Sequence, residues 1–158
     1  MRHTIIYVLL ILAVVVTGSL PFDQSDVGKL RPVQTLYGQW ADGQVRVTAD
    51  TGDRGQGDDW QSAIEALEAS APGTVFQGAV SYILLEEPSL LPQILEVEAL
   101  NPSCVVCLAP PGLDLEEAGT YLDAHEPESS LRLLRAGAIA LPRLAWTEGR
   151  FFLIGAEN

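Results

Sequence analysis

The sequence predicts a single extracytoplasmic domain of mixed α/β (α+β) class: a mixed sheet with N-terminal and C-terminal β-hairpins and about four helices, preceded by an N-terminal hydrophobic helix. First, 158 residues, of which 47% are hydrophobic, suffice for one core of ordinary size. Second, β-branched apolar runs alternate along the chain with segments of helical periodicity. Third, the first 22 residues differ sharply in composition from the rest. We therefore divide the chain into a signal peptide or membrane anchor (1–22), a tether (23–29) and one domain (30–158).

The N-terminal segment carries the clearest physical signal. Residues 4–22 contain no charge, and Ile5 to Val16 are twelve consecutive apolar residues. As a helix, residues 4–22 would extend about 28 Å, close to the hydrocarbon thickness of a bilayer. The positive start and the small residues that follow the apolar run fit a secretory signal peptide equally well. A buried core helix is the weaker alternative, so we expect membrane contact through residues 4–22.

The charge distribution predicts where the domain lies and which partners it avoids. Arg2 precedes the apolar segment, whereas Asp23 and Asp26 follow it, which predicts an N-in, C-out orientation, or secretion if the segment is cleaved. Residues 23–158 carry a net charge of -13. Because nucleic-acid binding needs a basic face, this charge excludes nucleic acid, and it disfavours attachment to anionic lipid.

A β-hairpin begins the predicted domain. Residues 33–37 are rich in β-forming side chains, and Asp42-Gly43 is a strong two-residue hairpin signal. Residues 45–49 alternate between apolar and polar, which predicts a ribbon with one solvated face. Residues 51–59, rich in Gly and Asp, predict a loop.

The remaining elements follow from periodicity and from helix start and stop signals. Trp60, Ile64 and Leu67 recur at helical spacing, and Asp58 or Asp59 can cap the helix that contains them. Beyond this helix, over 60–71, the sequence predicts buried strands over 75–85 and 103–108, helices over 86–100, 113–125 and 129–136, and a closing hairpin over 141–154.

The two cysteines have the spacing of a redox motif. A reactive Cys-X-X-Cys pair needs its first thiol exposed at a helix N-terminus. Cys104 and Cys107 lie instead in an apolar run that predicts a strand, where positions three apart face opposite sides. Buried thiols are therefore the favoured interpretation. His3 and His125 are too distant in sequence to complete a zinc site with them, and we expect no metal.

Acidic residues supply the other candidates for chemistry. Asp50, Asp53, Asp58 and Asp59 offer calcium ligands, but their spacing is not that of an EF-hand, and a solvated loop is the default. The pairs Glu86-Glu87 and Glu116-Glu117 suggest acid/base catalysis, although acids at helix starts more often complement the helix dipole. His125 has no nucleophile placed with it. We therefore nominate no catalytic, cofactor-binding or metal-ligating residue and expect no cofactor.

Several segments together resemble a known family. Val16-Thr17-Gly18-Ser19 ends the export segment like a lipoprotein box, except that Ser19 stands where the lipidated Cys is required. Residues 16–108 resemble the N-terminal domain of the Ger(x)C-type spore-germination lipoproteins in the order of their segments. The segments are this export segment and then residues 30–37, 45–49, 74–78 and 83–86. A chance match of four small residues to the lipoprotein box is an equal alternative, and we expect no lipid on Ser19.

The resemblance implies a relative that lacks the lipobox Cys. It also implies a shortened relative, because members of the family continue through further domains. Its members are non-enzymatic proteins on the outer membrane face, and with two integral-membrane partners they form germinant receptors. We therefore expect a non-catalytic, membrane-tethered accessory or interaction protein with protein partners in a spore membrane complex. An exported domain that binds a small ligand or cell wall through residues 50–59 is the alternative, and a thiol-redox protein that uses Cys104 and Cys107 is less favoured.

Overall fold

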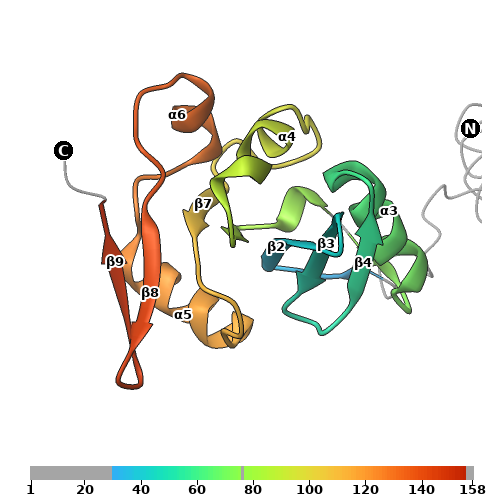
Figure 1. Ribbon diagram of the computed structural model, residues 1–158, viewed down its shortest axis with the longest axis horizontal. Helices are drawn as coiled ribbons and strands as arrows, with labels where there is room; N and C mark the ends of the chain where they lie inside the picture. Colours follow the sequence, from blue (N-terminus) through green and yellow to red (C-terminus); the bar gives the residue numbers. More distant parts are fainter. Residues whose placement is uncertain (1–29, 76, 156–158) are drawn as a thin grey trace, which may run out of the picture. The chain divides into compact units, whose positions relative to one another are not determined.

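The computed structural model describes residues 30–75 and 77–155, which form a seven-stranded mixed sheet with helices on both faces (Figure 1). This architecture confirms the mixed α/β class. The predicted hydrophobic helix and the tether lie outside the described residues. Within the described ranges, no helix has both the length and the apolar character needed to cross a bilayer.

The sheet has parallel strands at its centre and antiparallel pairs at both edges. Its strand order is β4-β3-β2-β6-β7-β8-β9, where β2, β6, β7 and β8 run parallel and the other neighbours pair antiparallel. A separate two-stranded sheet contains β1 (Leu30–Arg31) and β5 (Thr74–Val75). The strands of the main sheet are β2 (Thr35–Ala41), β3 (Gln44–Ala49), β4 (Arg54–Gly57), β6 (Tyr82–Leu85), β7 (Val105–Leu108), β8 (Arg143–Thr147) and β9 (Arg150–Ile154).

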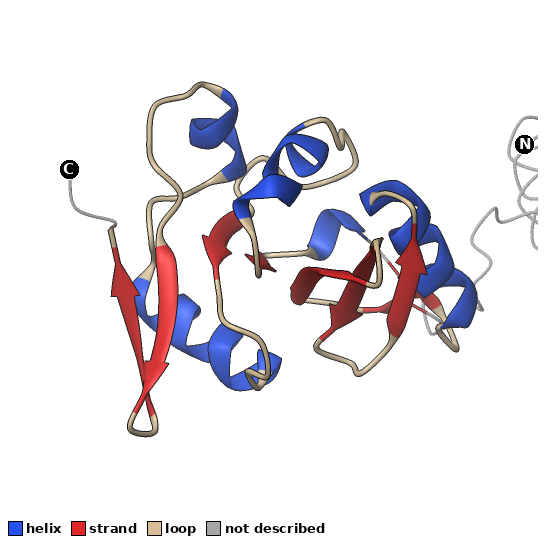
Figure 2. Cartoon of the chain, viewed as in Figure 1, coloured by secondary structure: helices blue, strands red, loops and turns tan. Residues whose placement is uncertain are grey.

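The described helices divide between the two faces of this sheet. Side chains of α3 (Trp60–Ser70), α4 (Leu91–Leu95) and α6 (Leu131–Arg135) belong to one buried cluster. Side chains of α5 (Leu115–His125) belong to a second cluster with Leu84, Cys107 and Leu144 of the sheet. In the view of Figure 2, α4 and α6 lie above the sheet and α5 lies below it. The sheet therefore separates two apolar cores.

Both predicted hairpins are present. Asp42 and Gly43 have φ values of 55° and 80°, and Glu148 and Gly149 have φ values of 52° and 76°. Two consecutive positive φ angles are the geometry that matches the right-handed twist of paired strands. The Asp-Gly and Glu-Gly pairs thus turn β2 into β3 and β8 into β9.

The predicted loop over 51–59 is wrong in part, because residues Arg54–Gly57 form β4 on the edge of β3. Glycine is a poor strand former, so the composition predicts a loop. Here it permits close packing: a Cβ on Gly55 would collide with the backbone oxygen of Ala63 in α3. Helix α3 can approach this strand only where side chains are absent.

The predicted strand over 75–85 is also divided. Residues Gln77–Ala79 form a 3₁₀ turn, and only Tyr82–Leu85 join the main sheet. The polar and glycine residues at 77 and 78 interrupt the apolar run, and the Val80 amide donates to the Gln77 carbonyl at 3.1 Å. The apolar residues of this segment therefore predict that it is buried, but they do not predict that it forms one continuous strand.

The predicted helix over 86–100 is much shorter in the structure. A 3₁₀ turn, Pro88–Leu90, precedes α4, which ends at Leu95. The side chain of Arg135 in α6 donates to the carbonyls of Leu95 at 2.9 Å and Val97 at 2.7 Å. These bonds satisfy carbonyls that a longer helix would have used internally.

Candidate functional site

An open groove of about 880 Å³ lies between α5 and the β8–β9 hairpin. One wall is the exposed side of α5, and the other is the face of the hairpin that carries Trp146 and Phe151. The cross-strand register places these two residues opposite each other, because the two-residue turn pairs Thr147 with Arg150. The groove is therefore built by one helix and one hairpin, both of them predicted elements.

Aromatic rings form a continuous row along the groove. The Tyr121 and His125 rings are stacked, with centroids 3.9 Å apart, as i and i+4 neighbours on α5. Phe151 lies 5.4 Å from Tyr121 and 4.3 Å from Trp146, centroid to centroid. Trp146 remains 43% exposed. The row thus connects the helix to the hairpin and presents ring surface to solvent.

Three carboxylates line the groove at the N-terminal end of α5. Asp114 caps α5 by accepting hydrogen bonds from the Glu116 and Glu117 amides, each at 3.0 Å. All three acids line the groove, and Arg150 is the basic counterpart on the hairpin side. The Glu116-Glu117 pair therefore occupies the first turn of α5, as the helix-dipole interpretation predicts. The surplus of acids makes the groove electronegative.

The second carboxylate pair lies elsewhere. Glu86 lines a cavity of about 410 Å³ at the carboxyl ends of β6 and β7, beside Pro110, Pro111 and Trp146. Glu87 instead accepts a hydrogen bond from the Ser89 hydroxyl at 3.2 Å and does not line that cavity. The structure thus separates these two neighbours, and they do not form a matched acid and base around one cavity.

The two cysteines are buried in different cores. Cys104 belongs to the cluster that contains α3, α4 and α6, whereas Cys107 belongs to the cluster beneath α5. This confirms the prediction that they face opposite sides. Both are free thiols, and burial raises the pKa of Cys104 to about 12 and that of Cys107 to about 11. Neither thiol therefore has the thiolate character of a redox centre.

The aspartates of residues 50–59 make bonds within the domain. Asp50 accepts from the Gln34 and Thr35 amides, each at 3.0 Å, and Asp53 accepts from the Thr51 hydroxyl at 2.7 Å. Asp58 accepts from the Gln44 side chain at 2.9 Å, and Asp59 caps α3 through the Ser62 amide at 2.7 Å. Over the described ranges, no group of three or more His, Cys, Asp or Glu side chains converges on a possible metal position.

The sequence reasoning missed the aromatic row. Trp146 and Phe151 appear in the sequence only as β-forming residues of the closing hairpin. Their cross-strand pairing follows from the two-residue turn, so the contact between these two rings could have been predicted from the sequence. The approach of α5 to the hairpin had no local signal, because it depends on the tertiary arrangement of the sheet.

Comparison with protein-family models, curated proteins and solved structures finds no match to this chain.

Proposed function

We propose that this chain is a non-catalytic interaction protein that binds a basic segment of a protein partner in the groove between α5 and the β8–β9 hairpin. One observation carries the proposal: an aromatic row that includes the exposed Trp146 lines the same groove as three carboxylates. Aromatic faces attract cations through the ring quadrupole, and Trp is the strongest of the aromatic side chains in this role. Lysine or arginine side chains of a partner would bind both to the aromatic faces and to the carboxylates of the groove.

Electrostatics supports the same class of partner at longer range. The whole chain has a net charge of -12, so an approaching basic segment is attracted before contact. The groove is open along its length, which suits an extended peptide better than an enclosed small molecule. The buried thiols and the separated Glu86-Glu87 pair agree with a non-catalytic role.

We place this interaction protein in the setting that its sequence indicates. The chain is tethered to the outer face of the membrane through residues 4–22, or is released if that segment is cleaved. It acts as an accessory to a spore membrane complex. The uncharged N-terminal segment and the resemblance over residues 16–108 support this setting. Carbonate washing of membranes tests the tether, since a cleaved form is released into the soluble fraction. Constitutive expression in vegetative cells would contradict the link to germination.

Binding of a labelled hexa-arginine peptide to the full-length chain, followed by fluorescence anisotropy, tests the groove directly. Replacing Trp146 by Ala should weaken binding about tenfold, because it removes the exposed ring. Phe152→Ala is the matched control: this ring is 47% exposed on the same hairpin but does not line the groove. Equal loss in both variants would show that the hairpin contributes only general hydrophobic surface.

The carboxylates require a separate pair of variants. Glu116→Gln with Glu117→Gln should reduce the affinity for the peptide and its dependence on salt, because two attractive charges are lost. Glu96→Gln with Glu98→Gln removes the same charge from a loop outside the groove and should have a smaller effect. If the two double variants behave alike, the peptide responds to net charge and the groove is not its site.

A further inference from the structure

A further cavity, of about 230 Å³, is lined by side chains of β2, β3 and β4 and by the loop that leads into α5. The strand register aligns Tyr37, Thr48 and Arg54 in one row across three strands, with Gln39 and Arg46 in the next row. All five side chains line the cavity, and the loop residues Gly112 and Leu113 form part of its opposite wall. The site is thus assembled by segments far apart in sequence.

The lining of this cavity is unusual for so acidic a chain. The sequence has 21 acids and 9 bases, yet the cavity is lined by two arginines and by no acid. Guanidinium, hydroxyl and side-chain amide groups are the donors that proteins use to bind oxyanions. The chemistry of the lining therefore opposes the net charge of the molecule and matches an anionic ligand.

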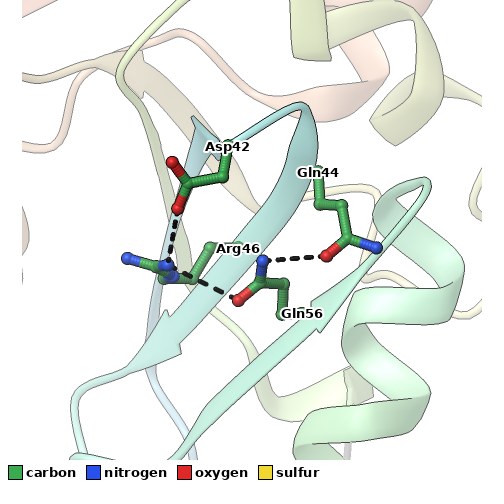
Figure 3. Close-up of polar contacts among 4 residues, drawn as sticks. All are labelled: Asp42, Gln44, Arg46 and Gln56. Carbon is green, nitrogen blue, oxygen red and sulfur yellow. Dashed lines mark hydrogen bonds and ion pairs between the residues drawn. The ribbon is translucent and has the colours of Figure 1, made fainter.

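Arg46 is oriented by a chain of polar contacts, shown in Figure 3. Its guanidinium donates to the Gln56 side chain at 3.4 Å and lies 4.0 Å from the Asp42 carboxylate. Gln56 in turn donates to Gln44 at 2.9 Å. These contacts restrict the arginine before any ligand arrives, which lowers the entropy cost of binding.

Tyr37 contributes a buried hydroxyl-bearing side chain to the same lining. It is only 6% exposed, and the Glu86 carboxylate lies close enough to its hydroxyl to act on it through both charge and hydrogen bonding. Burial, and then the Glu86 carboxylate, raise the pKa of Tyr37 well above its usual range, so the phenol stays protonated. A protonated phenol in the wall of the cavity is a neutral hydrogen-bond donor, and it does not repel an anion as a phenolate would.

We propose that this cavity binds a compact oxyanion, a phosphate or carboxylate group on a small molecule, between Arg46 and Arg54. Its volume of about 230 Å³ is below the range of roughly 300–1,000 Å³ that is typical of drug-sized ligands. The ligand is therefore little larger than the anionic group itself. This site is separate from the proposed peptide groove, since the two share no lining residue.

Isothermal titration of the full-length chain at constant ionic strength tests the site with three probes. Inorganic phosphate represents the free anion, glycerol phosphate represents a phosphate monoester like that of a lipid headgroup, and succinate represents a carboxylate. We expect saturable binding of at least one probe, and the preferred probe identifies the source of the anion. Absence of binding by all three would overturn the proposal.

Variants assign any binding to the cavity. Arg54→Gln and Arg46→Gln should each weaken it about tenfold or more, and Arg54→Lys should fall between Arg54→Gln and the unaltered chain, because lysine keeps the charge but loses the bidentate geometry. Tyr37→Phe should weaken it severalfold. Arg132→Gln removes the same charge from α6, outside the cavity, and should leave binding unchanged. Unchanged affinity in Arg54→Gln would overturn the proposal, whereas unchanged binding of the hexa-arginine peptide in that variant is expected.

Discussion

Single glycines determine how closely the helices approach the sheet. Gly38 in β2 leaves the space that the Trp60 ring fills, so a Cβ there would collide with that ring. Gly119 has the same role in α5, where a Cβ would lie 2.6 Å from the Thr35 hydroxyl oxygen. Gly55 is the most restrictive position, because it faces the backbone of α3 rather than a movable side chain.

Replacing Gly55 by Ala should therefore lower the free energy of unfolding by about 1–3 kcal/mol, the usual range for overpacking a core. Chemical denaturation followed by circular dichroism measures this loss. Gly112→Ala is the comparison: no atom lies within 4 Å of its Cβ position, but its φ of 80° makes alanine strained. We expect a smaller loss there, near 1 kcal/mol. Equal losses would mean that conformational strain, and not contact with α3, sets the requirement for Gly55.

At the scale of elements, the Arg135 side chain links two short helices, because it extends from α6 and donates hydrogen bonds to carbonyls at the end of α4 and just beyond it. Replacing it by Ala removes the bonds to the Leu95 and Val97 carbonyls and should destabilise the domain by about 1–2 kcal/mol. Arg132→Ala is the control on the same helix, since its side chain makes no such bond to α4. Thermal denaturation of both variants compares them. If the two losses are equal, helix propensity explains them and the contact with α4 contributes nothing.

The elements also show what local sequence can predict. The hairpins and the cap of α3 depend on short-range chemistry: the hairpins are confirmed, and of the two predicted cap candidates, Asp58 and Asp59, the structure uses Asp59. The end of α4 depends on a side chain forty residues away, and β4 depends on a partner strand, so composition was misleading at both. The two candidate sites have the same origin, because each joins α5 or the loop before it to strands distant in sequence.

At the scale of the whole molecule, the buried thiols make stability sensitive to alkaline pH. Burial raises the pKa of Cys104 to about 12 and that of Cys107 to about 11, whereas unfolded cysteine titrates near 8.5. The folded state thus holds protons that the unfolded state releases. The resulting stability is fully present below about pH 8 and declines as the pH rises through the folded values.

Unfolding under reducing conditions from about pH 7 to 10 should therefore show a progressive loss of stability above about pH 8.5. The double variant Cys104→Ala with Cys107→Ala starts from a lower stability, because it creates cavities, but its decline over this interval should be shallower. Charge repulsion in an acidic chain affects both proteins alike. Parallel curves would show that the thiols contribute nothing to the pH dependence.

The position of the two cysteines on opposite faces of one sheet also affects how the chain folds in the presence of an oxidant. Cys104 directly precedes β7 and Cys107 lies within it. Where the chain is extended, residues three apart are about 10 Å from each other, beyond the roughly 7 Å that a disulfide can bridge. An unfolded chain has no such restriction, so Cys104 and Cys107 can be cross-linked before β7 enters the sheet. That cross-link is incompatible with the native strand. Folding and oxidation therefore compete, and the yield of native protein depends on which is faster, although both thiols are free once the domain is formed.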